Sequence, residues 1–270
     1  MSLYTRKYHR RIRRHIWTVA MLLAMASGLL THVTYAGAAD VPADSKARAQ
    51  LVNLLGELRG IKAIQSTFLC EKKLRVLTNP FFSRGVITIA RPRKVRFQTN
   101  WPYRSCYILN GRDIYMRGQS DSKWRRGTVD SQPAIGIIMR QFAAWSLGNA
   151  AKASSHYQVS VRQAVRPAPA IPVSGAHGAA TVHSAARPIM LRLFTLRPGG
   201  KALKRSIREI QLGFAPTRSR GSITPRATPH SELVFIRIVS VSGDQSLFWL
   251  RHNTLNPRLK QDIFAPVGPA

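Results

Sequence analysis

Side chains that could carry out catalysis are few in this sequence, and they do not fall at the spacings that enzymes use. The eight histidines are scattered, and none has the ligand spacing of a zinc site. The 11 acidic residues are too sparse for a paired-carboxylate site, and Asp113 and Asp121 stand beside turns, where aspartate is common. The sequence has no nucleophile elbow, phosphate-binding loop or dinucleotide fingerprint. We therefore predict a protein that is not an enzyme and that uses no metal or cofactor.

The two cysteines, Cys70 and Cys106, could form a disulfide. A compartment outside the cytoplasm would favour that bond. The two residues fall on predicted strands that are separated in sequence, so the sheet must curl to bring them together. The sequence alone leaves both outcomes open.

The first 38 residues have the three parts of a secretory signal peptide. Residues 1–15 contain six basic and no acidic side chains, residues 16–30 are uncharged, and a small-residue site follows at Ala36-Gly37-Ala38. Cleavage there would leave residues 39–270 as the mature, exported domain. An uncleaved membrane anchor is the alternative, although the apolar run is shorter than the roughly 20 residues that a bilayer span needs.

Positive charge dominates the composition. Lysine and arginine number 42 against 11 acidic residues, a net charge of +31, and removal of the six basic residues of the signal segment leaves +25. Such a charge attracts nucleic acid, anionic lipid headgroups or acidic polysaccharide, and export argues against nucleic acid. The basic residues are spread along the mature chain, so they are either an adaptation to an acidic medium or part of a lipid-facing surface.

Hydrophobic periodicity divides the mature chain into two helices and two groups of strands. Residues 44–63 place leucines at helical spacing, and residues 133–148 show the same period between a proline and a glycine. Segments with a period of two follow each helix, and Asn110-Gly111 is the clearest hairpin signal. The predicted strands are 65–77, 84–91, 94–99, 104–110 and 112–117, then 156–164, 189–197, 206–214, 232–242 and 245–252.

The order of these elements predicts an α+β fold with one antiparallel sheet and helices gathered on one face. Residues 166–188 are rich in proline, alanine, glycine and serine. We expect them to form a mobile surface insertion within one domain, rather than a domain boundary.

Alternation along the strands predicts one apolar face and one face that carries arginine. Ile87 and Ile89, for example, share one side of their strand, and Arg91 has the same parity. A large sheet with an apolar face must curl and cover that face. Alternation shows burial but not volume, so the sequence does not separate a core filled by side chains from a cavity open to a ligand.

Several short motifs occur in the order that they have in a known family. They are Ile64-Gln65-Ser66-Thr67-Phe68, SRGVITIARP at 83–92, Arg96-Phe97, Trp101-Pro102-Tyr103, LNGRDIY at 109–115, and Asn253 to Pro257 followed by Leu259 and Ile263-Phe264. Over roughly residues 43–264 the chain resembles the LolA family of periplasmic outer-membrane lipoprotein carriers. Residues 71–85 look closer to a divergent LolA-like subgroup.

That resemblance implies an unclosed antiparallel β-barrel, a strongly curved sheet of about ten strands, with a helical lid on its concave face. The concavity would bind the acyl chains of lipoproteins or related lipids. A monomeric protein would carry them through the periplasm from an inner-membrane donor complex to an outer-membrane receptor. The family's functional arginine corresponds to Arg91, which would contact the lid, although a strand-end arginine can also reach solvent.

The implied site residues form two sets. The lid set is Arg91, Ile135, Ile138, Met139 and Phe142. The acyl-chain set is Phe68, Ile87, Ile89, Val95, Phe97, Leu191, Leu193, Ile210, Leu212, Ile236, Phe248 and Leu250. The residues also leave open a second function, that of a non-catalytic cell-envelope module whose basic face binds anionic lipid headgroups or polysaccharide.

Overall fold

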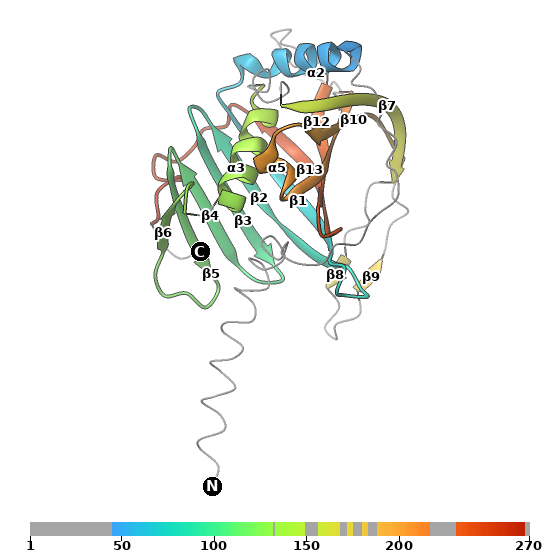
Figure 1. Cartoon of the computed structure of the whole chain (residues 1–270). Helices are drawn as coiled ribbons and strands as arrows, with labels where there is room; N and C mark the ends of the chain where they lie inside the picture. Colours follow the sequence, from blue (N-terminus) through green and yellow to red (C-terminus); the bar gives the residue numbers. More distant parts are fainter. Residues whose placement is uncertain are drawn as a thin grey trace.

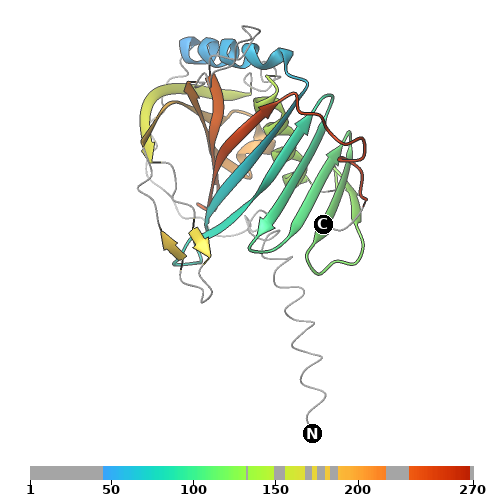
Figure 2. The same ribbon diagram turned by 180° about the vertical axis from the view of Figure 1, so that it is seen from behind.

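The computed structural model describes residues 45–131, 133–148, 156–167, 172–174, 180–182, 188–216 and 231–267. Figure 1 shows that this part of the chain forms an α+β fold, in which one antiparallel sheet curves around a helix. Figure 2 shows the same sheet from behind. The predicted signal peptide, residues 1–38, lies outside the described residues. None of the described helices is long and apolar enough to cross a membrane.

Eleven strands form the main sheet, and every neighbouring pair is antiparallel. Their order across the sheet is β6-β5-β4-β3-β2-β1-β13-β12-β11-β10-β7, so the pairing of β1 with β13 joins the two halves. The edges are β6 and β7, and the sheet is therefore unclosed, as predicted. The strands are β1 Ala63–Lys73, β2 Phe81–Ala90, β3 Lys94–Trp101, β4 Ser105–Asn110, β5 Asp113–Gly118, β6 Arg125–Thr128, β7 Tyr157–Pro167, β10 Pro188–Pro198, β11 Ile207–Pro216, β12 Ser231–Ser240 and β13 Gln245–Leu255.

The predicted strands match those of the structure within a few residues, with two differences. The four-residue β6, with the sequence RRGT, was not predicted because it has no apolar alternation. The expected insertion at 166–188 begins and ends inside paired strands, because β7 and β10 pair along their whole length. Between them, β8 Pro172–Ser174 and β9 Ala180–Val182 form a small sheet of their own.

In the described part of the chain, two longer helices and two short ones accompany the sheet. They are α2 Ser45–Glu57 with its continuation η1 Leu58–Gly60, α3 Pro133–Ser146, and α5 Lys201–Lys204. The leucines of α2 are buried, as their helical spacing predicts. Figure 1 shows α3 lying against one side of the curved sheet and α2 crossing one end of it. We call the side of the sheet that faces α3 the inner face and the opposite side the outer face.

The outer face carries apolar clusters of its own, so the prediction of a single apolar face is wrong. One outer cluster contains Cys106 and Ile108, and Phe264 of the C-terminal segment 256–267 packs on it. Arg96 fixes this segment, because its Nη1 donates a hydrogen bond to the Ile263 carbonyl at 3.0 Å. A second outer cluster consists of Leu191, Leu193, Ala215, Val234, Phe235 and Trp249.

Candidate functional site

Phenylalanine rings from four elements fill the space between α3 and the inner face. Phe68 of β1 stacks on Phe97 of β3 with ring centroids 4.5 Å apart. Phe142 of α3 meets Phe248 of β13 edge to face at 5.2 Å, and Phe97 lies 6.0 Å from Phe248. These are favourable aromatic geometries. Through them α3 contacts both halves of the sheet in one continuous inner cluster.

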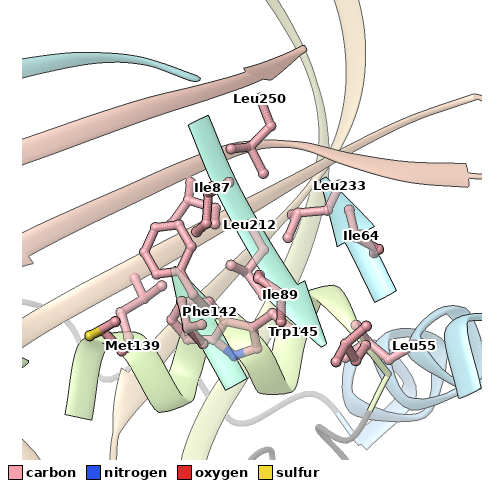
Figure 3. Close-up of a cluster of buried hydrophobic side chains, with 14 of the residues drawn as sticks. Leu55, Ile64, Ile87, Ile89, Met139, Phe142, Trp145, Leu212, Leu233 and Leu250 are labelled. Atoms are coloured by element: carbon pink, nitrogen blue, oxygen red, sulfur yellow. The ribbon is translucent and has the colours of Figure 1, made fainter. Parts of the chain in front are cut away.

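Most residues that the sequence assigns to acyl-chain binding lie together in this inner cluster. They are Phe68, Ile87, Ile89, Val95, Phe97, Ile210, Leu212, Ile236, Phe248 and Leu250. From the lid set, Met139 and Phe142 are buried in the cluster and Ile138 packs against it, whereas the side chain of Ile135 lies outside the described residues. Figure 3 shows Met139, Phe142 and Trp145 of α3 close to Ile87, Ile89 and Leu212. Trp145 was not assigned to the lid set, although it continues the helical spacing of Phe142.

Leu191 and Leu193 do not line the interior, and their assignment to acyl-chain binding is wrong. They lie on the outer face, while Phe194 and Leu196 of the same strand belong to the inner cluster. The strand has apolar residues at both parities, so alternation does not choose between its two faces. The register with β11 decides the question, because it pairs Phe194 with the inner residue Leu212.

The described side chains of α3 that meet the inner face are closely packed against it. Phe142 and Trp145 of α3 are 2% and 1% exposed. The interior beneath them is apolar and belongs to the same cluster as the buried strand residues.

Arg91 connects the sheet to the ends of two helical segments. Its Nε donates a hydrogen bond to the Ile61 carbonyl at 3.0 Å, and its Nη2 donates to the carbonyls of Arg59 at 3.1 Å and of Leu147. Leu147 directly follows α3, and Arg59 lies in η1. Carbonyls at helix ends lack partners within the helix and carry partial negative charge, which a guanidinium satisfies. The Leu147 bond ties the C-terminal end of α3 to the sheet.

The same end of α3 lies very close to α2. Gly148 has a φ of +69°, and a Cβ atom there would lie 2.1 Å from the Leu55 carbonyl oxygen. Only glycine adopts this conformation and this approach without displacing the chain. The helix α2 is itself attached to the edge strand β7, since Arg48 Nη2 donates to the Tyr157 carbonyl at 2.8 Å. The C-terminal end of α3 is therefore held from two sides.

Two buried polar atoms of the inner cluster have no hydrogen-bond partner among the described residues, Trp145 Nε1 and Tyr157 Oη. Burial raises the pKa of Tyr157 to about 12, so its hydroxyl is neutral and can donate. A buried donor that is left unpaired costs about 1–3 kcal/mol. Both groups could pair with acceptor oxygens of a ligand that entered the interior.

Cys70 and Cys106 are free and buried, so the disulfide that the sequence left open does not form. Strands β2 and β3 lie between β1 and β4, which separates the two cysteine strands by about 14 Å. Cys70 belongs to the inner cluster and Cys106 to an outer one. A disulfide needs Cα atoms within about 7 Å and side chains that point at each other.

Both thiols of the folded chain should resist a thiol reagent at about pH 8 and react fully once the chain is unfolded. Burial raises the pKa of Cys70 to about 12 and that of Cys106 to about 11, and the thiolate is the reactive form. Intact mass after treatment with a maleimide, with and without denaturant, measures this. If the chain folded in an oxidising buffer had an intact mass lower by two hydrogens, the two cysteines would be joined by a disulfide.

The edge strand β7 borders a hollow of about 470 Å³ that sequence reasoning missed. Gln50 of α2, Val161, Arg162 and Gln163 of β7, and Arg192 of β10 line it. Pairing of β7 with β10 sets Gln163 opposite Arg192 and Arg162 opposite Leu193. The 166–188 stretch separates the two arginines in sequence, so no local pattern marks the hollow.

Solved structures with a similar fold share little sequence with this chain. A LolA superfamily protein from Nitrosomonas europaea is 12% identical and matches 83% of this chain and 97% of its own, with a TM-score of 0.40. The lipoprotein LppX from Mycobacterium tuberculosis is 10% identical and matches 80% of this chain and 99% of its own, with a TM-score of 0.40. LprF from Mycobacterium bovis is 12% identical and matches 81% of this chain and 97% of its own, with a TM-score of 0.41. No protein-family model and no curated protein matches the sequence. The predicted resemblance to LolA proteins is thus found as a structural match at low identity.

Proposed function

We propose that the protein binds the acyl chains of lipoproteins or related lipids between α3 and the inner face, and carries them across the periplasm from the inner to the outer membrane. The observation that carries this proposal is the construction of the interior. A continuous apolar cluster lies under a helix whose C-terminal end is held to the sheet by the Arg91 bond to Leu147. An apolar interior beneath a helix suits a cargo that enters when the helix moves aside and leaves when it returns.

The free energy gained by burying an acyl chain is similar in size to the free energy needed to move α3 off the sheet. Transfer of one long acyl chain out of water is worth about 10 kcal/mol, at roughly 0.8 kcal/mol per methylene. Exposing the buried side chains of Met139, Phe142 and Trp145 costs about 1.5–3 kcal/mol each, or roughly 5–9 kcal/mol together. The opening of α3 therefore offsets most of the gain from one chain. Such a balance supports reversible binding, which a carrier needs in order to release its cargo.

The polar atoms of the interior favour an acyl ester over a plain hydrocarbon. Trp145 Nε1 and Tyr157 Oη are donors that lack partners among the described residues. The carbonyl oxygen of an ester or amide that links an acyl chain to its headgroup is an acceptor. Its entry would pair a donor that the closed interior leaves unpaired.

Native mass spectrometry of the full chain, purified from envelope extract without denaturant, tests this function. We expect a bound mass that tandem fragmentation identifies as an acylated lipid or lipoprotein. The same preparation is then delipidated and titrated with a fluorescent fatty acid. Binding of polyanions that salt reverses, together with no acylated mass and no fatty-acid binding, would contradict the carrier and support the envelope module.

A further inference from the structure

The loop between β1 and β2 exposes two neighbouring aliphatic side chains. The loop covers residues 74–80, and every residue from 75 to 80 is exposed. Val76 is 87% exposed and Leu77 is 53% exposed. A single apolar side chain on a surface is ordinary, whereas neighbouring ones that join a larger patch indicate an interaction site.

The β12–β13 turn, residues 241–244, extends this apolar patch. It begins with Val241, which is 52% exposed. The backbone N–H of Arg75 donates a hydrogen bond to Asp244 Oδ1 at 2.8 Å, and this bond holds the loop against the turn. The backbone N–H of Val241 donates to the Ser206 carbonyl at 3.2 Å, which adds the segment before β11 to the same surface. We call this surface the loop corner and define it as residues 74–80, 203–208 and 241–244.

Exposed cations accompany the three apolar side chains of the loop corner. They are Arg75, Lys204, Arg205 and Arg208. The one acidic residue of the loop corner, Asp244, accepts the hydrogen bond from the Arg75 backbone. The loop corner therefore has a net charge of +3, and this charge attracts an anionic surface.

Exposed aliphatic side chains beside exposed cations fit the interface of an anionic bilayer. Such an interface takes apolar side chains into the boundary between headgroups and acyl chains, and it places basic side chains among the phosphates. A soluble polyanion would pair with the cations but would leave Val76, Leu77 and Val241 in water. The combination of both kinds of side chain in one surface thus favours a membrane over a dissolved polymer.

We propose that the loop corner docks on the anionic surface of a bilayer, with Val76 and Leu77 in the headgroup region and the four cations beside lipid phosphates. Docking needs no acyl chain in the interior, so it goes beyond the proposed carrier function. Lys72 pairs with Phe81 directly before the loop and shares the inner side of β1 with Cys70 of the inner cluster. Docking therefore brings this end of the inner face to the membrane.

Flotation with lipid vesicles tests the docking. Residues 39–270 are used, because the apolar segment 16–30 can bind vesicles by itself and all described elements lie within 45–267. At about 0.1 M salt, vesicles that contain phosphatidylglycerol should bind the protein about tenfold or more tightly than vesicles of phosphatidylcholine alone. Salt at about 0.5 M should remove most of this preference.

The double variant Val76→Ser/Leu77→Ser should bind the anionic vesicles about tenfold or more weakly than the wild type. The matched control is Val165→Ser/Met190→Ser, which removes two apolar side chains that are each 59% exposed and lie outside the loop corner, on β7 and β10. This control should retain the wild-type affinity. An equal loss in both double variants would reduce the effect to general hydrophobicity and overturn the docking surface.

The cations are tested in the same way. Arg75→Gln/Arg205→Gln should weaken binding to the anionic vesicles about tenfold or more. Arg93→Gln/Arg258→Gln removes the same charge from two exposed arginines outside the loop corner, and its affinity should stay within about threefold of the wild type. Equal losses in the two variants would assign the binding to total charge and contradict a defined surface.

A label at the loop shows whether it enters the bilayer. Val76→Cys, labelled with a polarity-sensitive fluorophore, should emit at shorter wavelength on anionic vesicles, and the same label on Met190→Cys should not. An unchanged spectrum of vesicle-bound protein would exclude insertion of the loop. Absence of binding to any vesicle would overturn the docking and leave the carrier function standing. Docking without fatty-acid binding would remove the carrier function alone.

Discussion

Replacing Arg91 with leucine should tighten the binding of a fatty acyl probe by about tenfold and slow its release by a similar factor. The substitution removes the hydrogen bond from the guanidinium to the Leu147 carbonyl, and with it a tie between α3 and the sheet. A hydrogen bond to a charged group contributes about 1.5–3 kcal/mol. With a smaller opening cost, more of the free energy of chain burial appears as affinity. Stopped-flow transfer of a fluorescent fatty acid to acceptor vesicles measures the release.

Arg93→Leu is the matched control for Arg91→Leu. Arg93 is exposed in the same turn between β2 and β3, and the change removes the same charge. It should leave affinity and release unchanged, and both variants should show the strand content of the wild type by circular dichroism. Release from Arg91→Leu at the wild-type rate would exclude a role for Arg91 in holding α3 closed.

Replacing Phe142 with alanine should destabilise the fold by about 3–5 kcal/mol and at the same time strengthen acyl binding. The ring is 2% exposed and contacts Phe97, Trp145 and Phe248, so its loss leaves a void in the interior. A fatty chain can fill that void and no longer has to displace the ring. Urea unfolding and titration with the fluorescent fatty acid measure the two effects.

Phe235→Ala is the control that distinguishes a gain in acyl binding caused by new space under α3 from one caused by a less stable fold. Phe235 is as deeply buried as Phe142, but it lies in the outer cluster with Leu191 and Trp249. Its loss should cost a similar free energy of unfolding and leave acyl affinity unchanged. If both variants bound the fatty acid more tightly, general loosening of the fold, rather than the interior under α3, would explain the gain.

Local patterns predicted much of this fold because they act over a few residues. The leucine stripe of α2 follows from helical spacing, and Asn110-Gly111 forms the turn of the β4–β5 hairpin, with Gly111 at a φ of +65°. The resemblance to LolA proteins implies that Arg91 contacts a covering helix, and Arg91 donates a hydrogen bond to the carbonyl of Leu147, directly after α3. These signals need only the chain on either side of the residue.

The features that the sequence did not reveal depend on pairing between distant strands. The faces of β10 remained ambiguous until its register with β11 was known, and the separation of Cys70 from Cys106 follows from the sheet order. The hollow of Arg162 and Arg192 exists only because β7 pairs with β10. How closely α3 packs on the inner face depends on how its aromatic rings fit against the strands. The alternation of apolar residues along the strands does not predict this fit.

The sheet ends in two edge strands, β6 and β7, and both carry arginines. Margin strands with free amide and carbonyl groups are templates for fibre-like association between molecules. Here β7 carries Arg162 and Arg166, whereas Arg125 and Arg126 of β6 are each in an ion pair with an aspartate. A second molecule that approached through its own β7 margin would bring guanidinium groups against guanidinium groups, and this repulsion opposes edge-to-edge pairing. We therefore expect the arginines of β7 to disfavour self-association through that edge of the open sheet.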